Sequence, residues 1–197
     1  MTPLPFSWPY WPVFWVVVIW AFGPEFRIVR AAQKPAARPD SLDAGSCRVI
    51  TRGGGIASLV AFAIAWAPFG RVSTDLRTVV FGVGILLIIL GSLLRRHCWR
   101  MLGSSFTGDV RAEPNQKIVT TGAYRLLRHP SYSAGILMNC GVGLALGSWA
   151  SAVLLTLAAF VVYGVRIRVE EAALVRVLGE PYREFMGTRR RIIPFIY

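Results

Sequence analysis

The chain has 197 residues, of which 54% are hydrophobic and only 16% are charged, well below the roughly one quarter typical of a soluble domain. This composition excludes an ordinary soluble fold and predicts an integral membrane protein. The net charge of +12 could suggest a nucleic-acid partner, but the basic residues lie between long apolar runs and do not form one basic face. We therefore expect no nucleic-acid binding.

Five apolar runs predict an all-α membrane fold with five transmembrane helices. They cover residues 6–22, 53–69, 78–94, 133–146 and 150–165. The second and third runs are near the lower length limit for a membrane span. Only Gly147, Ser148 and Trp149 separate the last two runs, so these should form an antiparallel hairpin.

The basic residues predict the orientation of these helices. All of the 22 lysines and arginines except Arg71 and Arg77 fall between residues 27 and 52, between 95 and 128, or after 165. The positive-inside rule therefore places these three segments in the cytoplasm and the N-terminus outside. Arg95 and Arg96 directly follow the third run, and their long side chains can snorkel to the membrane surface.

The helix of the fifth run should continue beyond the membrane as a cytoplasmic extension, because good helix formers follow it as far as Gly179. On this extension Arg166 and Glu170 are four residues apart and share one face, whereas Arg168 and Glu171 are three apart on another. Both pairs could be plain surface ion pairs. Because they emerge beside a basic segment, we favour a functional role, above all for the first pair.

Residues 117–135 form a polar, basic and aromatic segment where the hairpin begins. Pro130 fixes its own φ and disfavours a helical conformation at His129, so a new helix should begin near Ser131. Arg128 and His129 then lie at a helix N-terminus, whose free N–H groups suit a carboxylate or phosphate. The alternative is that these cations are merely the cytoplasmic flank of a membrane helix.

Several other kinds of site have no support in the sequence. Cys47, Cys98 and Cys140 show neither metal-ligand spacing nor a disulfide framework, and His97 and His129 are far apart, so we expect no metal site. The glycines between residues 141 and 147 resemble a dinucleotide fingerprint, but they lie inside an apolar run without a preceding strand. We interpret them as helix-packing residues.

Motifs in the second half of the chain resemble those of one known family. They occupy residues 104–106, 119–124, 128–132, 170–171, 174, 179–180, 182 and 193–195. In order and spacing they are similar to those of the isoprenylcysteine carboxyl methyltransferase family, in a short prokaryotic-type form. One departure is Ala134, where the family's Arg-His-Pro-x-Tyr-x-Gly pattern has glycine and where Gly135 follows here.

The resemblance implies an enzyme that transfers a methyl group from S-adenosylmethionine to the carboxylate of a lipid-linked acceptor such as a prenylated cysteine, leaving S-adenosylhomocysteine. It implies a site that faces the cytoplasm of a bacterial inner membrane. Residues 1–102 would be a three-span membrane region and residues 103–197 the methyltransferase motif region, both within a single integrated domain. The bilayer and the lipidic acceptor would be the partners.

The resemblance also assigns residues by position. Arg128, Arg166 and Glu170 become the catalytic candidates, with the two arginines holding the acceptor carboxylate. The implied cofactor contacts are Val119, Gly122, Tyr124, His129, Pro130, Tyr132 and Glu170, with Tyr182, Phe185, Arg190 and Pro194 closing the pocket from the C-terminal side.

Three other functions remain open at this point. A methyltransferase of phospholipids or other amphiphiles would share the cofactor motif but would act on an amine. A membrane sterol-type reductase could use a similar Arg-His-Pro-x-Tyr loop for a nicotinamide cofactor. A scaffold without catalytic activity would use its basic loops only to bind anionic lipid.

Overall fold

The computed structural model of the chain describes residues 2–32, 42–103, 106, 110, 112 and 116–193. This part contains two isolated β-bridges but no strand, which confirms the all-α prediction. The helices are α1 (Tyr10–Ala32), α2 (Ser46–Trp66), α3 (Arg77–Leu102), α4 (Pro130–Ala145), α5 (Trp149–Leu178) and α6 (Glu180–Thr188), with short 3-10 turns η1 (Leu4–Phe6), η3 (Thr74–Leu76) and η5 (Gly122–Arg125).

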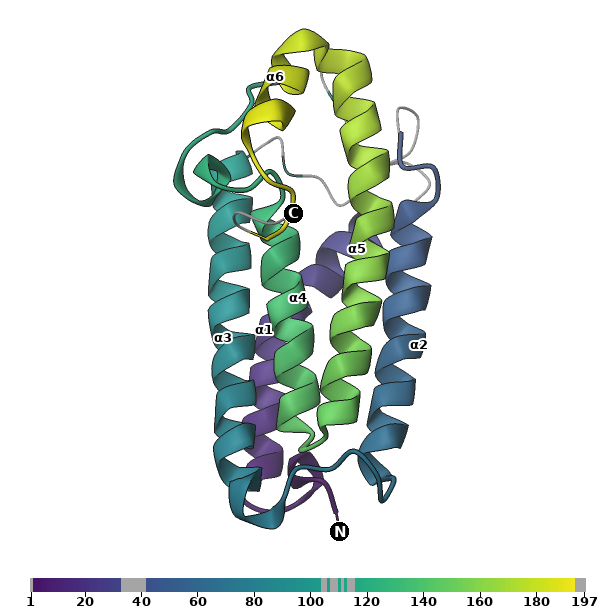
Figure 1. The fold of residues 1–197 in the computed structure, drawn as a ribbon, viewed down its shortest axis with the longest axis vertical. Helices are drawn as coiled ribbons and strands as arrows, with labels where there is room; N and C mark the ends of the chain where they lie inside the picture. Colours follow the sequence, from purple (N-terminus) through teal and green to yellow (C-terminus); the bar gives the residue numbers. More distant parts are fainter. Residues whose placement is uncertain are drawn as a thin grey trace.

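Helices α1 to α5 form one bundle along the long axis of the molecule, and α6 covers one end of it (Figure 1). Helix α4 packs between α3 and α5, while α2 packs against the other side of α5. Helix α1 packs mainly against α3 and η1, and its C-terminal part lies behind α4 and α5 in this view. The end of the bundle beside α6 is called the α6 end below. It brings together the segments that hold the polar motifs described in the sequence analysis.

Four helices are long and apolar enough to cross a bilayer, namely those within residues 10–28, 46–66, 74–102 and 149–178. The chain is therefore a multi-pass membrane protein. Helix α4 has 16 residues and lies at the centre of the bundle, but at about 1.5 Å per residue it is shorter than a full span. The count of five spans stays a prediction.

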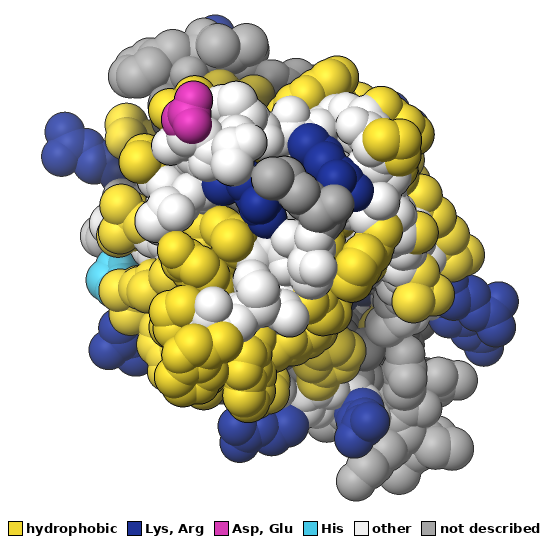
Figure 2. Space-filling model, turned by 90° about the horizontal axis from the view of Figure 1, so that it is seen from below, with side chains coloured by type: hydrophobic (Ala, Val, Ile, Leu, Met, Phe, Trp, Pro, Cys, Tyr) yellow, Lys and Arg dark blue, Asp and Glu magenta, His cyan; other side chains and the backbone are white. Residues whose placement is uncertain are grey.

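The end opposite α6 carries few charged groups. Figure 2 shows hydrophobic side chains covering much of this end. Arg71 there donates a hydrogen bond to the carbonyl of Trp66, and Arg77 donates one to the carbonyl of Thr2. This contrast with the α6 end is what the distribution of lysine and arginine along the sequence predicts.

Three predicted boundaries are wrong because charged residues belong to the helices. Helix α2 begins at Ser46, before the predicted start at residue 53. Helix α1 runs to Ala32, beyond the predicted end at residue 22, and α3 runs to Leu102, beyond residue 94. For α1 and α3 the cause is a set of contacts between the two helices. Arg95 is buried and pairs with Glu25 instead of snorkelling to the surface, and Arg96 stacks over the Trp20 ring with its guanidinium carbon 4.4 Å from the ring centroid. A charge with a partner inside the bundle does not have to end a helix.

The prediction for the last two long helices is confirmed. Helices α4 and α5 form a hairpin that turns at Gly147, whose φ is +71°, and Ser148 caps α5 by accepting a hydrogen bond from the Ser151 amide. Helix α5 continues without a break to Leu178, and Gly179 ends it with a φ of +65°. Both glycines adopt a backbone conformation that other residues rarely reach.

The seam between α3 and α4 depends on glycine. A Cβ atom added at Gly84 would lie 2.5 Å from the Ala145 nitrogen and 2.6 Å from the Gly141 carbonyl oxygen, which is far inside contact distance. The two backbones can approach only because these side chains are missing.

We therefore predict that Gly84→Val lowers the thermal stability of the purified protein in detergent, because overpacking of a tight interface costs roughly 1–3 kcal/mol. Gly82→Val is the matched control, since a Cβ at Gly82 meets nothing within 4 Å. Thermal unfolding of both variants checks this. Equal melting temperatures for the two would show that the seam tolerates a side chain.

Candidate functional site

A cavity of about 170 Å³ lies at the α6 end of the bundle. Its walls come from α1, α2, α3, α5, α6, the segment before α4 and the first turn of α4. Apolar and aromatic side chains form much of the wall, and a group of charged and hydroxyl side chains gathers on one side. The members of this group used below are Glu25, Arg95, Arg128, His129, Tyr132, Arg166 and Glu170.

The motif loop, residues 122–133, is positioned by backbone pairing with the C-terminal segment, residues 189–193. The Arg128 amide donates to the Arg190 carbonyl at 2.7 Å, and the His129 amide donates to the Arg191 carbonyl at 3.0 Å. The Ser133 hydroxyl donates to the Ile192 carbonyl at 2.5 Å. The two segments that the sequence predicts on either side of a pocket thus lie side by side.

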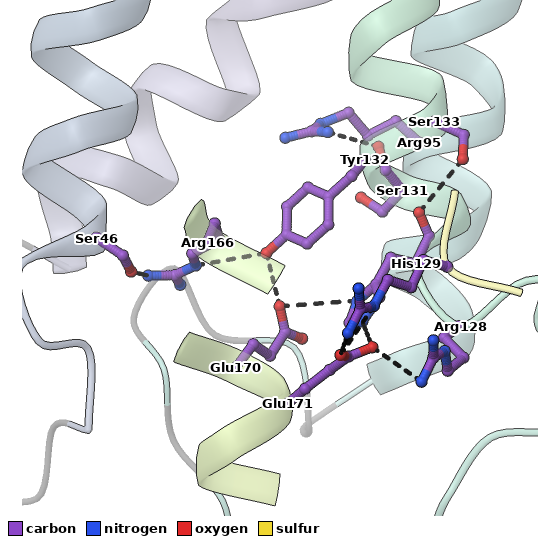
Figure 3. Close-up of polar contacts among 11 residues, drawn as sticks. Ser46, Arg95, Arg128, His129, Ser131, Tyr132, Ser133, Arg166, Glu170 and Glu171 are labelled. Atoms are coloured by element: carbon purple, nitrogen blue, oxygen red, sulfur yellow. Dashed lines mark hydrogen bonds and ion pairs between the residues drawn. The ribbon is translucent and has the colours of Figure 1, made fainter. Parts of the chain in front are cut away.

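The local start of α4 is also as predicted. Pro130 is the first residue of α4 and His129 is its N-cap, with a non-helical φ of −127° and ψ of 55°. Proline has no N–H group, and the first residue of a helix needs none, so Pro130 can begin the helix directly. The side chains of His129 and Tyr132 therefore point from the loop and the first turn toward α5 (Figure 3).

A buried carboxylate, that of Glu171 on α5, joins the motif loop to the C-terminal segment. Its Oε1 atom lies 3.2 Å from His129 Nε2 and 3.2 Å from an Arg128 nitrogen, while Arg191 donates to Oε2 at 3.1 Å (Figure 3). Glu171 is only 4% exposed. The predicted grouping of Glu171 with Arg168 on a separate face is wrong, because Arg168 is exposed and contacts with Arg128, His129 and Arg191 draw Glu171 into the bundle.

The predicted pair Arg166 and Glu170 lies at one site, but the Tyr132 hydroxyl lies between the two side chains. The Tyr132 hydroxyl donates to Glu170 Oε2 at 2.8 Å and accepts a hydrogen bond from Arg166 Nε at 3.4 Å (Figure 3). His129 Nδ1 lies 3.9 Å from the same Glu170 oxygen. The Glu170 side chain remains 30% exposed in the cavity.

Arg166 also ties α5 to the start of α2. It donates to the Asp43 carboxylate and, at 2.8 Å, to the Ser46 hydroxyl. Asp43 in turn accepts a hydrogen bond from the Cys47 amide at 3.0 Å in the first turn of α2. Arg166 is 4% exposed, so its position is fixed by neighbours on two helices.

Most of the residues assigned from the sequence line the cavity, and these are Val119, Tyr124, Arg128, His129, Tyr132, Arg166, Glu170, Tyr182 and Phe185. Gly122 and Pro130 shape the loop without lining the cavity. Arg190 is exposed and does not line the cavity, and its backbone carbonyl accepts the hydrogen bond from the Arg128 amide, so its role in closing the pocket stays a prediction. Pro194 lies outside the described residues, as do Ser104 and Ser105 of the first motif.

Sequence reasoning missed Glu25, Arg95 and Asp43. Arg95 contacts Glu25 with 2.6 Å between Nε and Oε1, and donates to the Ser131 carbonyl at 2.6 Å. One signal could have revealed Glu25, since an acidic residue so near an apolar run has to find a partner if the helix continues. Asp43 carries no comparable signal, because its partner Arg166 is distant in the sequence.

Two tyrosines in the cavity wall stay neutral at physiological pH. Burial raises the pKa of the Tyr124 phenol, and the nearby Cys98 and Glu170 raise it further. Burial also raises the pKa of Tyr182, with Glu170 and Glu171 adding to the effect. Both phenols can therefore donate hydrogen bonds or pack against a ligand, but neither can serve as a general base near neutral pH.

The profile of the phospholipid methyltransferase family matches residues 79–181, just over half of the chain, from the first turn of α3 to the start of α6. The chain belongs to this family. The matched residues contain the motif loop, Arg166, Glu170 and Glu171.

Individual relatives confirm the resemblance to isoprenylcysteine carboxyl methyltransferases. A probable protein-S-isoprenylcysteine O-methyltransferase from Oryza sativa subsp. indica is 34% identical over 116 residues, which cover 58% of this chain and 61% of the relative. Protein-S-isoprenylcysteine O-methyltransferase B from Arabidopsis thaliana is 33% identical over 115 residues, 57% of this chain and 58% of the relative. The chain thus spans about three fifths of the length of these relatives.

The fold is similar to that of a solved relative, a eukaryotic intramembrane Ras methyltransferase that is an isoprenylcysteine carboxyl methyltransferase. The TM-score is 0.61 and the sequences are 27% identical. The match covers 74% of this chain and 52% of that protein. The arrangement of helices is therefore shared over the matched part of the chain.

We predict that Glu171→Gln destabilises the protein by about 3 kcal/mol, because Arg128, His129 and Arg191 lose the one carboxylate between them. Glu180→Gln is the control, since Glu180 and Arg183 form an exposed ion pair with side chains 68% and 60% exposed. Thermal unfolding measures both. Similar melting temperatures for the two variants would mean that the Glu171 cluster does not hold the loop and the C-terminal segment together.

Proposed function

We propose that this chain is an integral-membrane methyltransferase that transfers a methyl group from S-adenosylmethionine to the carboxylate of a lipid-linked acceptor such as a prenylated cysteine. Family membership and the activities named for the relatives support the proposal. The observation that carries it is the cavity at the α6 end, where the motif residues meet charged groups from the membrane helices.

The residues present fit the charges of S-adenosylmethionine, which has a sulfonium, an ammonium and a carboxylate group. Glu170 faces the cavity and accepts a hydrogen bond from Tyr132, and within the described residues no lysine or arginine forms an ion pair with it. Its negative charge can therefore offset the cationic groups of the cofactor. His129 suits the carboxylate of the cofactor, and Tyr124, Tyr182 and Phe185 offer aromatic surface for the nucleoside.

Methyl transfer to a carboxylic acid does not require the protein to move a proton. S-adenosylmethionine, when bound, supplies an electrophilic methyl group on a positively charged sulfur. An acceptor carboxylate is already ionised near neutral pH, so no general base is required. Transfer of the methyl group would consume the negative charge of the acceptor and the positive charge of the sulfonium, so the residues around the cavity would only have to hold and align the two groups.

The protein's contribution is then alignment and exclusion of water. Opposite charges disappear during the reaction, so a poorly hydrated cavity favours the transition state over solvated reactants. Arg128 and Arg166 are the sequence-derived candidates to orient the acceptor carboxylate. Each is already paired, with Glu171 and Asp43 respectively, so neither would hold an acceptor carboxylate tightly, and orientation is the contribution that speeds the reaction.

The proposal includes the placement of the enzyme. We place the α6 end on the cytoplasmic side of a bacterial inner membrane, since the lysines and arginines gather in the segments at that end. We also treat residues 1–102 and 103–197 as one integrated domain. Glu25 and Arg95 from the first region line the same cavity as His129 and Glu170 from the second, which supports that description.

The family profile favours a second candidate, methylation of a phospholipid amine. An ammonium group must lose a proton before it can attack the methyl group, so this reaction needs a proton acceptor. The identity of the acceptor thus separates the two candidates.

We expect the purified protein, given S-adenosylmethionine with a labelled methyl group, to label an S-prenylated cysteine acid or a long-chain fatty acid. The product should be a methyl ester, which mild alkali hydrolyses to labelled methanol. Label in an aminophospholipid that resists alkali would instead favour the second candidate. If nothing is labelled and a nicotinamide nucleotide binds, the sterol-type reductase becomes the better interpretation.

Variants on α5 give the control for this assay. Glu170→Gln should raise the KM for S-adenosylmethionine about tenfold or more, because a charged contact is lost. Arg168→Ala should leave this KM unchanged, because Arg168 is exposed and does not line the cavity. Equal effects of the two substitutions would count against the role of Glu170.

A further inference from the structure

The orientation of Arg166 is set through two nitrogen atoms of its guanidinium. Nη1 donates hydrogen bonds to the Asp43 carboxylate and, at 2.8 Å, to the Ser46 hydroxyl, while Nε donates to the Tyr132 hydroxyl at 3.4 Å. A guanidinium is planar, so two fixed nitrogens determine the plane of the group and the direction of the third nitrogen, Nη2. Arg166 lines the cavity. Asp43 and Ser46 therefore help to determine how its guanidinium faces a ligand.

Asp43 has contacts of its own that hold its carboxylate in place. Its Oδ1 atom accepts a hydrogen bond from the Ser46 hydroxyl at 2.8 Å, and its Oδ2 atom accepts one from the Cys47 amide at 3.0 Å. Both donors belong to the first turn of α2, where the positive end of the helix dipole stabilises a negative charge. Asp43 is 8% exposed and Ser46 is 2% exposed. The carboxylate is thus a fixed part of the N-terminus of α2.

The hydrogen bonds continue from Arg166 to the motif residues. The Tyr132 hydroxyl, which accepts from Arg166, donates to Glu170 Oε2 at 2.8 Å. Figure 3 shows Ser46, Arg166, Tyr132 and Glu170 joined in this order by the dashed lines. The start of α2 is therefore connected through Arg166 to the carboxylate that faces the cavity.

Asp43 is not among the residues that line the cavity, so its influence on a ligand there passes through Arg166. It also lies outside residues 79–181, the part of the chain that matches the family profile, whereas Tyr132, Arg166 and Glu170 lie inside it. The close packing of α2 against α5 brings Asp43 to Arg166 across 123 positions of sequence. The N-terminal region of this chain thus supports residues that belong to the family motifs.

We propose that Asp43 is a positioning residue for methyl transfer, which holds the Arg166 guanidinium in the orientation that aligns the acceptor. This inference rests on the proposed function. Where a group contributes through orientation, a displacement of about 1 Å can cost on the order of a hundredfold in rate. Asparagine at this position would keep the shape of the side chain, but it would offer one acceptor oxygen to the three donors that Asp43 binds.

The test compares the wild-type protein with Asp43→Asn, using S-adenosylmethionine and N-acetyl-S-farnesylcysteine as substrates. We expect kcat to fall about tenfold or more, because the guanidinium loses its fixed orientation. The KM of S-adenosylmethionine and the affinity for S-adenosylhomocysteine should stay within about twofold, because Asp43 does not line the cavity. A kcat within about twofold of the wild-type value would overturn the inference.

A second background shows whether Asp43 acts through Arg166. Lysine carries the same charge as arginine but has no planar group to orient. In the Arg166→Lys protein, the further substitution Asp43→Asn should therefore lower kcat by less than about threefold, because two changes that act through one group are not additive. A loss of about tenfold in both backgrounds would mean that Asp43 acts on the fold and not through the guanidinium, and it would overturn the inference.

Two hydroxyl variants in the first turn of α2 keep the carboxylate and form a matched pair. Ser46→Ala removes the hydroxyl that contacts both Asp43 and Arg166, so kcat should fall about threefold with cofactor binding unchanged. Thr51→Ala removes a hydroxyl that donates to the Cys47 carbonyl, away from Arg166, and should leave kcat unchanged. Equal kcat values for the two variants would contradict the inference even if Asp43→Asn does not fold.

The failure of this inference can be told apart from the failure of the proposed function. If the wild-type protein methylates no acid at all, the proposed function itself fails. An active enzyme whose kcat is indifferent to Asp43 overturns only the positioning role.

Discussion

The cavity depends on one buried carboxylate, that of Glu171. It pairs with Arg128 and contacts His129 on the motif loop, and it pairs with Arg191 on the C-terminal segment, which is also joined to the loop by backbone hydrogen bonds and by the Ser133 hydroxyl. Away from water, like charges repel strongly, so the two arginines could not share the end of the bundle without an anion between them. The continuous helix α5 supplies that anion, because it runs past the membrane part of the bundle before Gly179 ends it.

Pairing of opposite charges also determines where the charged groups lie in the rest of the site. Arginines at the cavity are matched by carboxylates from other helices, and these pairs connect α1 to α3 and α2 to α5. Glu170 is different, since its closest polar partner is the neutral hydroxyl of Tyr132. The cavity therefore presents a negative charge toward a ligand at one point and paired cations elsewhere. This is a suitable environment for a cationic methyl donor beside an anionic acceptor, at the boundary between membrane and water.

The sequence predicted the features that depend on local rules. The all-α class, the length of α5 and the start of α4 at Pro130 follow from hydrophobic runs, helix formers and the geometry of proline. Charged residues at the ends of the runs misled the prediction, because Arg95 was taken to mark the membrane surface and is instead buried against Glu25. Likewise, helical spacing assigned Glu171 to a face with Arg168, whereas tertiary partners decide where it points. Pairs between distant segments cannot be found from the spacing within one helix.

Hydrogen–deuterium exchange with and without S-adenosylhomocysteine tests most directly whether the motif loop and the C-terminal segment form one wall of the cofactor site. The account predicts that the amides of residues 122–133 and 189–193 become protected together, because a ligand that bridges them suppresses local opening of both. Residues 70–76, at the opposite end of the bundle, should exchange as before. Protection confined to that opposite end, or a motif loop that becomes protected while residues 189–193 do not, would contradict the account.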